Sequence, residues 1–197
     1  ARNVEVSAVF TANAYSITVV QPTGGTISAS ATSATAGTTV KLTASPAEGY
    51  TLDYFTLDGA RINGDTFIMP ARNVEVSAVF TANAYSITVV QPTGGTVSAS
   101  ATSATAGTTI ELTANPAEGY TLDYFTLDGA RINGNTFIMP ARNVDVSAVF
   151  TANAYGITVV QPAGGTVSAS ATSATAGTTV KLTATPAEGY TLDYFTL

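Results

Sequence analysis

The sequence contains no cysteine, no histidine and no tryptophan, and charged residues make up only 10% of its 197 residues. An average soluble domain has about 25% charged residues. The absence of cysteine excludes disulfide bonds and thiolate metal sites. Histidine and cysteine supply most of the groups that exchange a proton near neutral pH, so few candidates for acid–base catalysis are left. We therefore expect a protein that is not an enzyme, with no catalytic, cofactor-binding or metal-binding residues and no cofactor.

Positive charge is also scarce. Seven Lys and Arg residues stand against 13 Asp and Glu residues, which gives a net charge of −6. Binding to nucleic acid needs clustered cations that displace counterions from the phosphates, so we expect no nucleic-acid partner. No run of about 18 apolar residues is present, so we expect no membrane span in this segment. The first residues, ARNVEV, lack the basic region and apolar core of a signal peptide.

What the chain does contain is a repeat of 70 residues, and this repeat sets its organisation. Residues 1–70 match residues 71–140 with five differences, and residues 71–127 match residues 141–197 with six. The five differences are Ile27/Val97, Val40/Ile110, Lys41/Glu111, Ser45/Asn115 and Asp65/Asn135. The position of Lys41 accepts charge reversal, so we expect it to face water. Ile27 and Val40 exchange only with other β-branched residues, so we expect them to be buried.

A folded unit need not begin where the chain begins. An aromatic residue opens each apolar run of the type YSITVVQP, at Tyr15, Tyr85 and Tyr155, and a short polar TANA segment precedes each one. The sequence therefore predicts the closing strand of a preceding repeat at 1–14, complete repeats at 15–84 and 85–154, and an incomplete repeat at 155–197. Units of this size are small domains rather than single solenoid coils, which have about 20–45 residues.

Each repeat has the alternation and the turn residues of short β-strands. The segments predicted to be strands in the first repeat are 17–21, 26–31, 39–44, 50–57, 60–62, 66–70 and 73–80. The Ala-rich segment 28–39 contains too much Ser and Thr to favour a helix, and no segment has helical periodicity. We therefore predict an all-β fold of tandem, small, β-sandwich-like domains arranged as a rod or fibre.

Several motifs of the repeat are specific. They are the opening YSITV, the segment GGTISAS, the centre AGTTVKLTASPAEGYTLDYF and the end TFIMPARNVEVSAVF. With these motifs the whole repeat resembles the divergent internalin-B-type B-repeats, which are tandem modules of bacterial surface and secreted proteins. The resemblance implies extracellular exposure, a spacer or adhesive role, and a β-grasp-like fold with a helix. Many members of that family carry Trp where this chain has Phe55, Phe125 and Phe195.

Carboxylates are the remaining candidates for chemistry. Asp53, Asp58 and Asp65 lie close in sequence and could form the carboxylate pair of a glycosidase. Asn135 replaces Asp65 in the next repeat and would disable that copy, so we interpret these residues as solvated turn residues. Asp58, Asn63 and Asp65 could also supply oxygen ligands to Ca²⁺, but their spacing fits no EF-hand, and Asp-Gly and Asn-Gly turns explain them.

Three further hypotheses concern binding and modification. Lys41 could form an isopeptide bond with an Asn, but Glu111 replaces it in the second repeat. Tyr50, Tyr54 and Phe55 could form a platform for a sugar, although alternation along a strand places one part of this set in the core. The Thr-rich segment 31–39 could be glycosylated or adhesive, or could be a plain solvated edge.

The linker between repeats is short, consisting of residues 81–84. We expect Phe80 and Tyr85 to pack near it and neighbouring repeats to stack, giving a semi-rigid rod that advances roughly 30–40 Å per repeat. The predicted function is a structural stalk or fibre segment of a bacterial extracellular or cell-surface protein. Its partners would be neighbouring repeats and other copies of the chain. The alternative is an adhesive module that recognises a glycan or a host protein.

The chain also starts in the middle of its own repeat, since residues 1–14 have the sequence of residues 71–84. The simplest interpretation is a window on a longer repetitive chain. The alternative is strand addition, in which the first residues of one copy complete the last repeat of another. The hairpin that follows residue 127 in the second repeat is missing from the third, which weakens this alternative.

Overall fold

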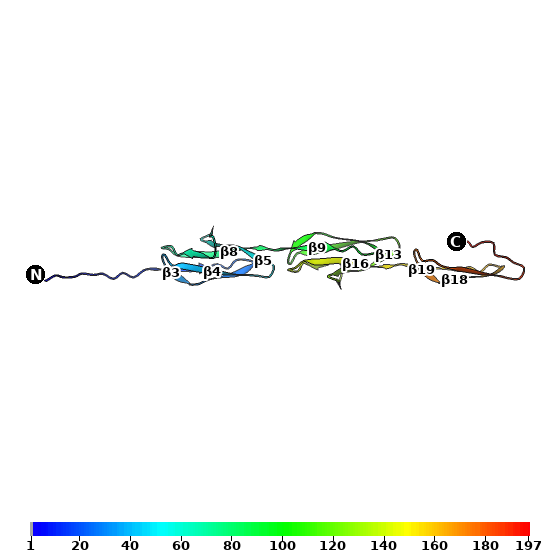
Figure 1. The fold of residues 1–197 in the computed structure, drawn as a ribbon, viewed down its shortest axis with the longest axis horizontal. Coiled ribbons are helices and arrows are strands. Elements are labelled where there is room, and N and C mark those ends of the chain that lie inside the picture. The colour runs from blue at the N-terminus through cyan, green and yellow to red at the C-terminus, as the bar shows by residue number, and fades with distance from the viewer. Residues whose placement is uncertain (1) are drawn as a thin grey trace. The chain divides into compact units, whose positions relative to one another are not determined.

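The computed structural model describes residues 2–197. Every regular element in that range is a β-strand, so the all-β prediction is confirmed (Figure 1). The helix that a β-grasp-like fold implies is absent from residues 2–197. The contacts divide the chain into two compact units. The first contains residues up to Ser86 with Ser103–Thr108 and Ile138–Asn143, and the second contains Ile87–Thr102, Thr109–Phe137 and Val144–Leu197.

Each complete repeat forms two sheets. The strands of the first repeat are β1 (Ala14–Val19), β2 (Gly25–Ala29), β3 (Ser33–Thr35), β4 (Thr39–Pro46), β5 (Tyr50–Leu57), β6 (Ala60–Arg61), β7 (Thr66–Ile68) and β8 (Val74–Ala82). One sheet has the order β3-β1-β8-β5-β6, and the other has the order β2-β4-β7. Figure 1 shows β8 and β4 in different layers of the first repeat.

The second repeat has the same strands in the same order. They are β9 (Ala84–Val89), β10 (Gly95–Ala99), β11 (Ser103–Thr105), β12 (Thr109–Pro116), β13 (Tyr120–Leu127), β14 (Ala130–Arg131), β15 (Thr136–Ile138) and β16 (Val144–Ala152). Its sheets are β11-β9-β16-β13-β14 and β10-β12-β15.

The closing strand β8 lies in the middle of the larger sheet. It pairs in parallel with β1, where Ile17 is opposite Val74, and antiparallel with β5, where Leu52 is opposite Phe80. Its sequence alternates, so that Val74, Val76 and Ala78 all point to one side. Val76 has no exposed surface at all. The strand that closes the repeat therefore supplies the most deeply buried side chain of the larger sheet.

The core lies between the two sheets and is made of aliphatic and aromatic side chains from both. The buried residues of the first repeat are Ile17, Ile27, Val40, Leu42, Phe55, Phe67, Met69, Val74, Val76 and Ala78. Ile27 and Val40 are among them, and Lys41 is exposed, as the differences between repeats predict. The two-layer arrangement with a shared core is that of a small β-sandwich.

A Gly-Gly turn at one end of the repeat allows two rings to approach the backbone. A Cβ atom at Gly24 would lie 2.5 Å from the ring of Tyr50, and one at Gly25 would lie 2.6 Å from the ring of Phe80. Real Cβ contacts are not this short, and Gly24 also has a φ of +87°. The glycines of the GGT motif are therefore required by the packing of Tyr50 and Phe80.

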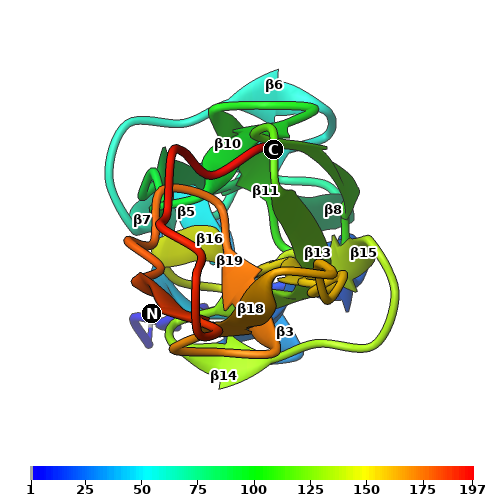
Figure 2. The same cartoon turned by 90° about the vertical axis from the view of Figure 1, so that its right-hand side faces the viewer.

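The third repeat has fewer strands than the first two. Its strands are β17 (Ala154–Gly156), β18 (Gly165–Ala169), β19 (Ser173–Thr175) and β20 (Leu182–Pro186). The residues after Pro186 form a loop without strands, which Figure 2 draws in red. The third repeat has an open apolar hollow of about 660 Å³, whose lining includes Ile157, Val159, Leu182 and Phe195.

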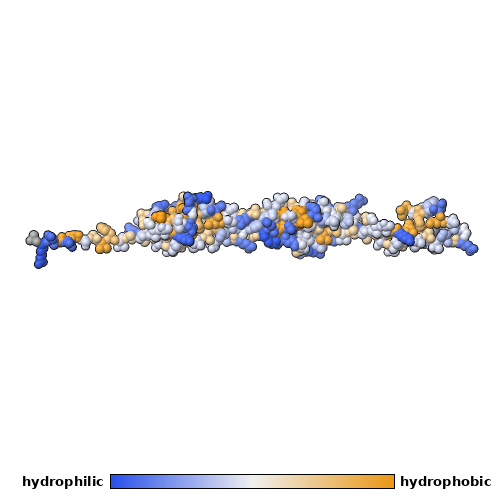
Figure 3. All heavy atoms as spheres, in the orientation of Figure 1, coloured by the Kyte–Doolittle hydropathy of each residue, from blue (hydrophilic) through white to orange (hydrophobic). Residues whose placement is uncertain are grey.

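Residues 2–13 form no strand in this structure, and the expectation that residues 1–14 are the closing strand of a preceding repeat stays a prediction. Their sequence is that of residues 72–83, which contain the whole of β8, yet they form no strand. Val6 and Phe10 are 91% and 92% exposed. Figure 3 shows apolar atoms, in orange, on this N-terminal segment. The physical reason is the absence of a partner, because the neighbours that this sequence has in the repeat, β1 and β5, are both already paired with β8.

A glutamine side chain covers the outer edge of β2. Gln21 donates from Nε2 to the carbonyl of Ile27 and accepts from the backbone N–H of Ile27 at Oε1, both at 2.9 Å. Gln91 makes the same two bonds to Val97, and Gln161 makes them to Val167. The amide thus satisfies backbone groups that an unpaired edge strand would offer to another chain.

We predict that Gln21→Ala lowers the free energy of unfolding of the first repeat by about 1–3 kcal/mol, because two half-buried backbone groups lose their partners. Denaturant unfolding measures the change. Amide hydrogen exchange at Ile27 should also become faster. The matched control is Gln21→Glu, which keeps an acceptor for the Ile27 N–H but has no donor for its carbonyl. Equal protection of Ile27 in all three proteins would contradict the assignment.

Candidate functional site: the repeat joint

The chain passes from one repeat to the next through a single residue outside the strands. β8 ends at Ala82 and β9 begins at Ala84, so only Asn83 lies between them. The sequence predicts a linker of four residues, 81–84, but three of these four residues belong to strands. We call Asn83 together with its hydrogen-bond partners the repeat joint, and the same name is used for Asn153 in the second repeat.

Hydrogen bonds hold Asn83 to the turn between β4 and β5 and to the start of β5. Its backbone N–H donates to the carbonyl of Gly49 at 2.7 Å, and its Oδ1 accepts from the hydroxyl of Thr51 at 2.7 Å. The preceding Thr81 donates from its hydroxyl to Asp53 Oδ2 at 2.6 Å. The joint therefore has both its backbone and its side chain fixed by the repeat that it leaves.

The second repeat has the same joint. The N–H of Asn153 donates to the carbonyl of Gly119 at 2.7 Å, and Thr121 donates to Asn153 Oδ1 at 2.6 Å. Thr151 also donates to Asp123. Because the hydrogen bonds recur with the same atoms, the joint is a property of the repeat and not of one position in the chain.

Small residues pack closely at the turn that holds the joint. Within the first unit, a Cβ atom at Gly49 would lie 3.3 Å from the Cβ of Ala106 and 3.6 Å from the Cβ of Ala141. Within the second unit, a Cβ atom at Gly119 would lie 3.4 Å from the Cβ of Ala176. A larger side chain at either glycine would have to displace these contacts.

The two aromatic residues expected near the joint contact different glycines. Phe80 packs on Gly25 within its own repeat, and the hydroxyl of Tyr85 lies 4.0 Å from the position of a Cβ atom at Gly49. Both residues are only partly exposed. Hydrogen bonding and contacts between small residues, rather than stacking of two rings, therefore define the joint.

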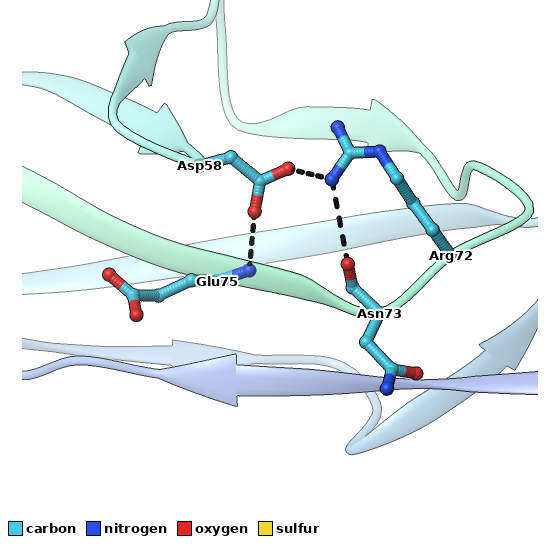
Figure 4. Close-up of polar contacts among 4 residues, drawn as sticks. All are labelled: Asp58, Arg72, Asn73 and Glu75. Carbon is cyan, nitrogen blue, oxygen red and sulfur yellow. Dashed lines mark hydrogen bonds and ion pairs between the residues drawn. The ribbon is translucent and has the colours of Figure 1, made fainter.

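A second cluster of polar residues fixes the turn after β5 (Figure 4). Asp58 and Gly59 both have positive φ angles, +48° and +79°, as a two-residue hairpin turn of type I′ requires. Asp58 accepts a hydrogen bond from the N–H of Glu75 at 2.8 Å and forms an ion pair with Arg72. It thus connects the turn to the closing strand β8. Asp128 accepts the same backbone bond from Asp145 in the second repeat.

The electrostatic surroundings of Asp58 favour its charged form. The hydrogen bond from the backbone of Glu75, followed by the one from Arg72, lowers the pKa of Asp58 below its ordinary value of 3.8, and partial burial opposes this only in part. The side chain of Asp58 is 31% exposed, so solvent screens the interaction.

The structure does not bring the three carboxylates of the sequence hypotheses together in one site. Asp58 binds Arg72, Asp53 accepts from Thr81, and Asp65 lies 3.7 Å from the Nζ of Lys41. Each carboxylate therefore has its own structural partner. Within residues 2–197, no group of three or more Asp and Glu side chains could hold a metal ion. No helix in that range is long and apolar enough to cross a membrane.

The pair formed by Lys41 and Asp65 explains two of the differences between repeats. In the second repeat Glu111 and Asn135 occupy these positions, and Asn135 Nδ2 donates to Glu111 Oε1 at 3.2 Å. An exposed ion pair is thus replaced by an exposed hydrogen bond, so a favourable contact is kept despite the charge reversal. The role of Lys41 in this structure is a surface contact between β4 and the residue that precedes β7.

The three aromatic residues of the sugar hypothesis do not form one platform. Phe55 is buried in the core, at 4% exposed, and Tyr50 packs on Gly24. Tyr54 is on the face of β5 opposite to Phe55. There the guanidinium of Arg61 lies 4.6 Å from the centre of the Tyr54 ring. The Thr-rich segment contains the short edge strand β3, and Thr35 and Thr38 share a hydrogen bond of 3.0 Å.

The sequence gives no sign of three of the residues described above. Gln21, Thr51 and Asn83 are uncharged, and almost every residue of this chain recurs after 70 positions, so recurrence does not single them out. Their partners lie between 6 and 34 residues away in the chain. Only the position of Asn83 in a short polar segment could have indicated the joint.

The fold and the joint define a class, that of tandem β-sandwich repeats connected without a free linker. The model of the divergent InlB B-repeat domain family matches residues 15–84, 85–154 and 155–197. The chain therefore belongs to the divergent InlB B-repeat family, and repeats of this family occur in bacterial surface proteins. The comparisons with curated proteins and with solved structures gave no match.

We predict that Asp58→Asn lowers the free energy of unfolding of the first repeat at pH 7. The difference in this free energy from the unchanged chain should disappear in acid. The folded pKa of Asp58 is lowered, so its charge stabilises the repeat above the ordinary pKa of 3.8 and stops doing so as the pH falls through the folded pKa. Urea unfolding at several pH values between 7 and 2 measures this. Glu48→Gln, which removes one charge elsewhere in the same repeat, is the control. A difference that does not depend on pH would show that the charge is not the cause.

Proposed function

We propose that the chain is a structural segment of a bacterial extracellular or cell-surface protein, in which near-identical β-sandwich repeats form a stalk or fibre. The observation that carries this proposal is the repeat joint. Only Asn83 lies outside the strands between the two complete repeats, and both its backbone and its side chain are hydrogen-bonded.

The joint favours a spacer because a flexible linker needs several residues with free φ and ψ angles. Here the residues on both sides of Asn83 are fixed by strand pairing, Ala82 with Tyr50 and Ala84 with Thr105. In a repeat protein of this kind, stability comes from each repeat and from its contacts with its neighbours. The spacing of whatever the stalk carries would then depend on the number of repeats.

The polar contacts of the repeat and its low content of charged residues support the same function. Among residues 2–197 the core contains no buried charged or polar residue, and the carboxylates form contacts that hold turns and strands. The low content of charged residues leaves little repulsion between copies. We therefore propose neighbouring repeats, and other copies of the chain, as the partners.

An adhesive role is the alternative, and one feature favours it. A hollow of about 410 Å³ on the first repeat is lined by Tyr54, Arg61, Asn63 and Asp65 among others. Rings and hydrogen-bonding side chains of this kind suit a glycan. The guanidinium of Arg61 already covers one face of Tyr54, which reduces the surface available for stacking, and we therefore rank adhesion second.

We predict that the joint restricts the distance between the two complete repeats. Because the chain has no native cysteine, Thr43→Cys and Thr113→Cys allow one spin label at the same exposed position in each repeat. The distance distribution should be narrow, and a Gly-Ser-Gly-Ser insertion after Asn83 should broaden it strongly. Asn83→Ala should broaden it less, since the backbone bond to Gly49 remains.

The control is the same insertion after Gly64, in an exposed hairpin of the first repeat, which should leave the distribution narrow. A distribution as broad in the uninserted chain as in the variant with the insertion after Asn83 would contradict the proposed stalk. Binding of glycans to the chain, lost on Tyr54→Ala but not on Thr43→Ala, would support the adhesive alternative instead.

A further inference from the structure

The first and last strands of each complete repeat are paired directly, in parallel. β1, through which the chain enters the repeat, runs alongside β8, through which it leaves, with Ile17, Thr18 and Val19 opposite Val74, Glu75 and Val76. The second repeat pairs β9 with β16 in the same register. Parallel pairing of the terminal strands places the start of β1 and the end of β8 at opposite ends of the paired stretch.

This arrangement determines how tension acts on the repeat. If the two ends of the repeat are pulled apart, β1 and β8 must slide along each other. All the hydrogen bonds between them are then loaded at the same time. In an antiparallel hairpin pulled at its open end, by contrast, the bonds are loaded and broken one after another. The same number of hydrogen bonds therefore resists more force in the parallel arrangement.

Further hydrogen bonds, from side chains and from the backbone, lengthen the paired stretch at both ends. Before it, the N–H of Ser16 donates to Asn73 Oδ1 at 2.9 Å. After it, the N–H of Val20 donates to the carbonyl of Val76 at 2.9 Å, and the hydroxyl of Ser77 donates to the carbonyl of Val20 at 2.9 Å. The second repeat has the equivalent bonds from Ser86 to Asn143, from Val90 to Val146, and from Ser147 to Val90.

The paired stretch is also protected from water on its inner side. Ile17, Val74 and Val76 are 6%, 4% and 0% exposed and belong to the core. Sliding β8 past β1 would therefore expose apolar surface and break the backbone bonds in the same step. Water has little access from this side to replace a bond that lengthens under load.

We propose that each complete repeat is a load-bearing unit and that the β1–β8 pair, with the bonds of Asn73 and Ser77, is its mechanical clamp. This function deepens the proposed stalk and rests on it for its biological meaning, since a surface stalk transmits tension along its chain. The clamp itself is a property of one repeat, so it can be tested separately from the stiffness of the joint.

Single-molecule force spectroscopy on the whole chain, held at its two ends, tests the clamp. The two complete repeats should unfold in separate events at similar forces. Asn73→Ala together with Ser77→Ala changes only the first repeat, so the second repeat is a matched control within the same molecule. We expect the unfolding rate of the changed repeat at constant force to rise about tenfold, which corresponds to about 1.4 kcal/mol of activation free energy. The unfolding rate of the second repeat at the same force should not change.

The direction of pulling gives an independent test. Lys41→Cys and Thr66→Cys provide attachment points at opposed residues of the antiparallel pair β4–β7, where bonds are loaded in sequence. The repeat should unfold at a clearly lower force through these points than through the chain ends. Thr43→Ala, on the exposed face of β4 outside the clamp, should leave the end-to-end force unchanged.

Two results would overturn the clamp. One is an end-to-end unfolding force no higher than the force measured through residues 41 and 66. The other is an unchanged rate for the first repeat in the Asn73→Ala/Ser77→Ala variant, when denaturant unfolding shows that the variant is folded. A high end-to-end force together with a broad distance distribution between the repeats would retain the clamp and contradict the stiff stalk.

Discussion

The position of the closing strand β8 governs the rest of the structure. It lies between β1 and β5, it supplies the most deeply buried side chain of the larger sheet, and it leads into the next repeat through Asn83 alone. The core of a repeat and its connection to the next repeat therefore depend on the same strand. A sandwich of about 70 residues without disulfide or metal has a small core, so losing this strand would remove a large part of its stability.

The sequence predicts the strands well where alternation and turn residues agree. The Asp58-Gly59 hairpin has the positive φ angles of a type I′ turn, and Val40 and Leu42 are buried while Lys41 between them is exposed. These features depend on residues near one another in the chain, which is why they can be recognised from a single sequence. The substitution of Glu111 for Lys41 indicates the exposed face equally well.

Residues 2–13 show that a strand-forming sequence also needs partner strands. The same sequence forms β8 at 74–82 and no strand at 4–12, so its propensity for a strand is realised only between two partner strands. The joint is equally hard to predict from the sequence. Asn83 acts through Gly49 and Thr51, which lie far from it in the chain, and no sequence pattern links them to it. Gln21 is recognised as the cover of an edge strand only when its two bonds to Ile27 are seen.

Parallel pairing of the terminal strands and the single-residue joint have a common consequence. Tension on the chain reaches Asn83 directly from β8 and passes directly into β9, because no free linker residue lies between them. A slack linker would extend first and would protect the repeats from small loads, whereas here the strand pairs carry the load from the beginning. A chain connected in this way needs repeats that resist sliding between β1 and β8. The hydrogen bonds of Asn73 and Ser77 strengthen the β1–β8 pair against this sliding.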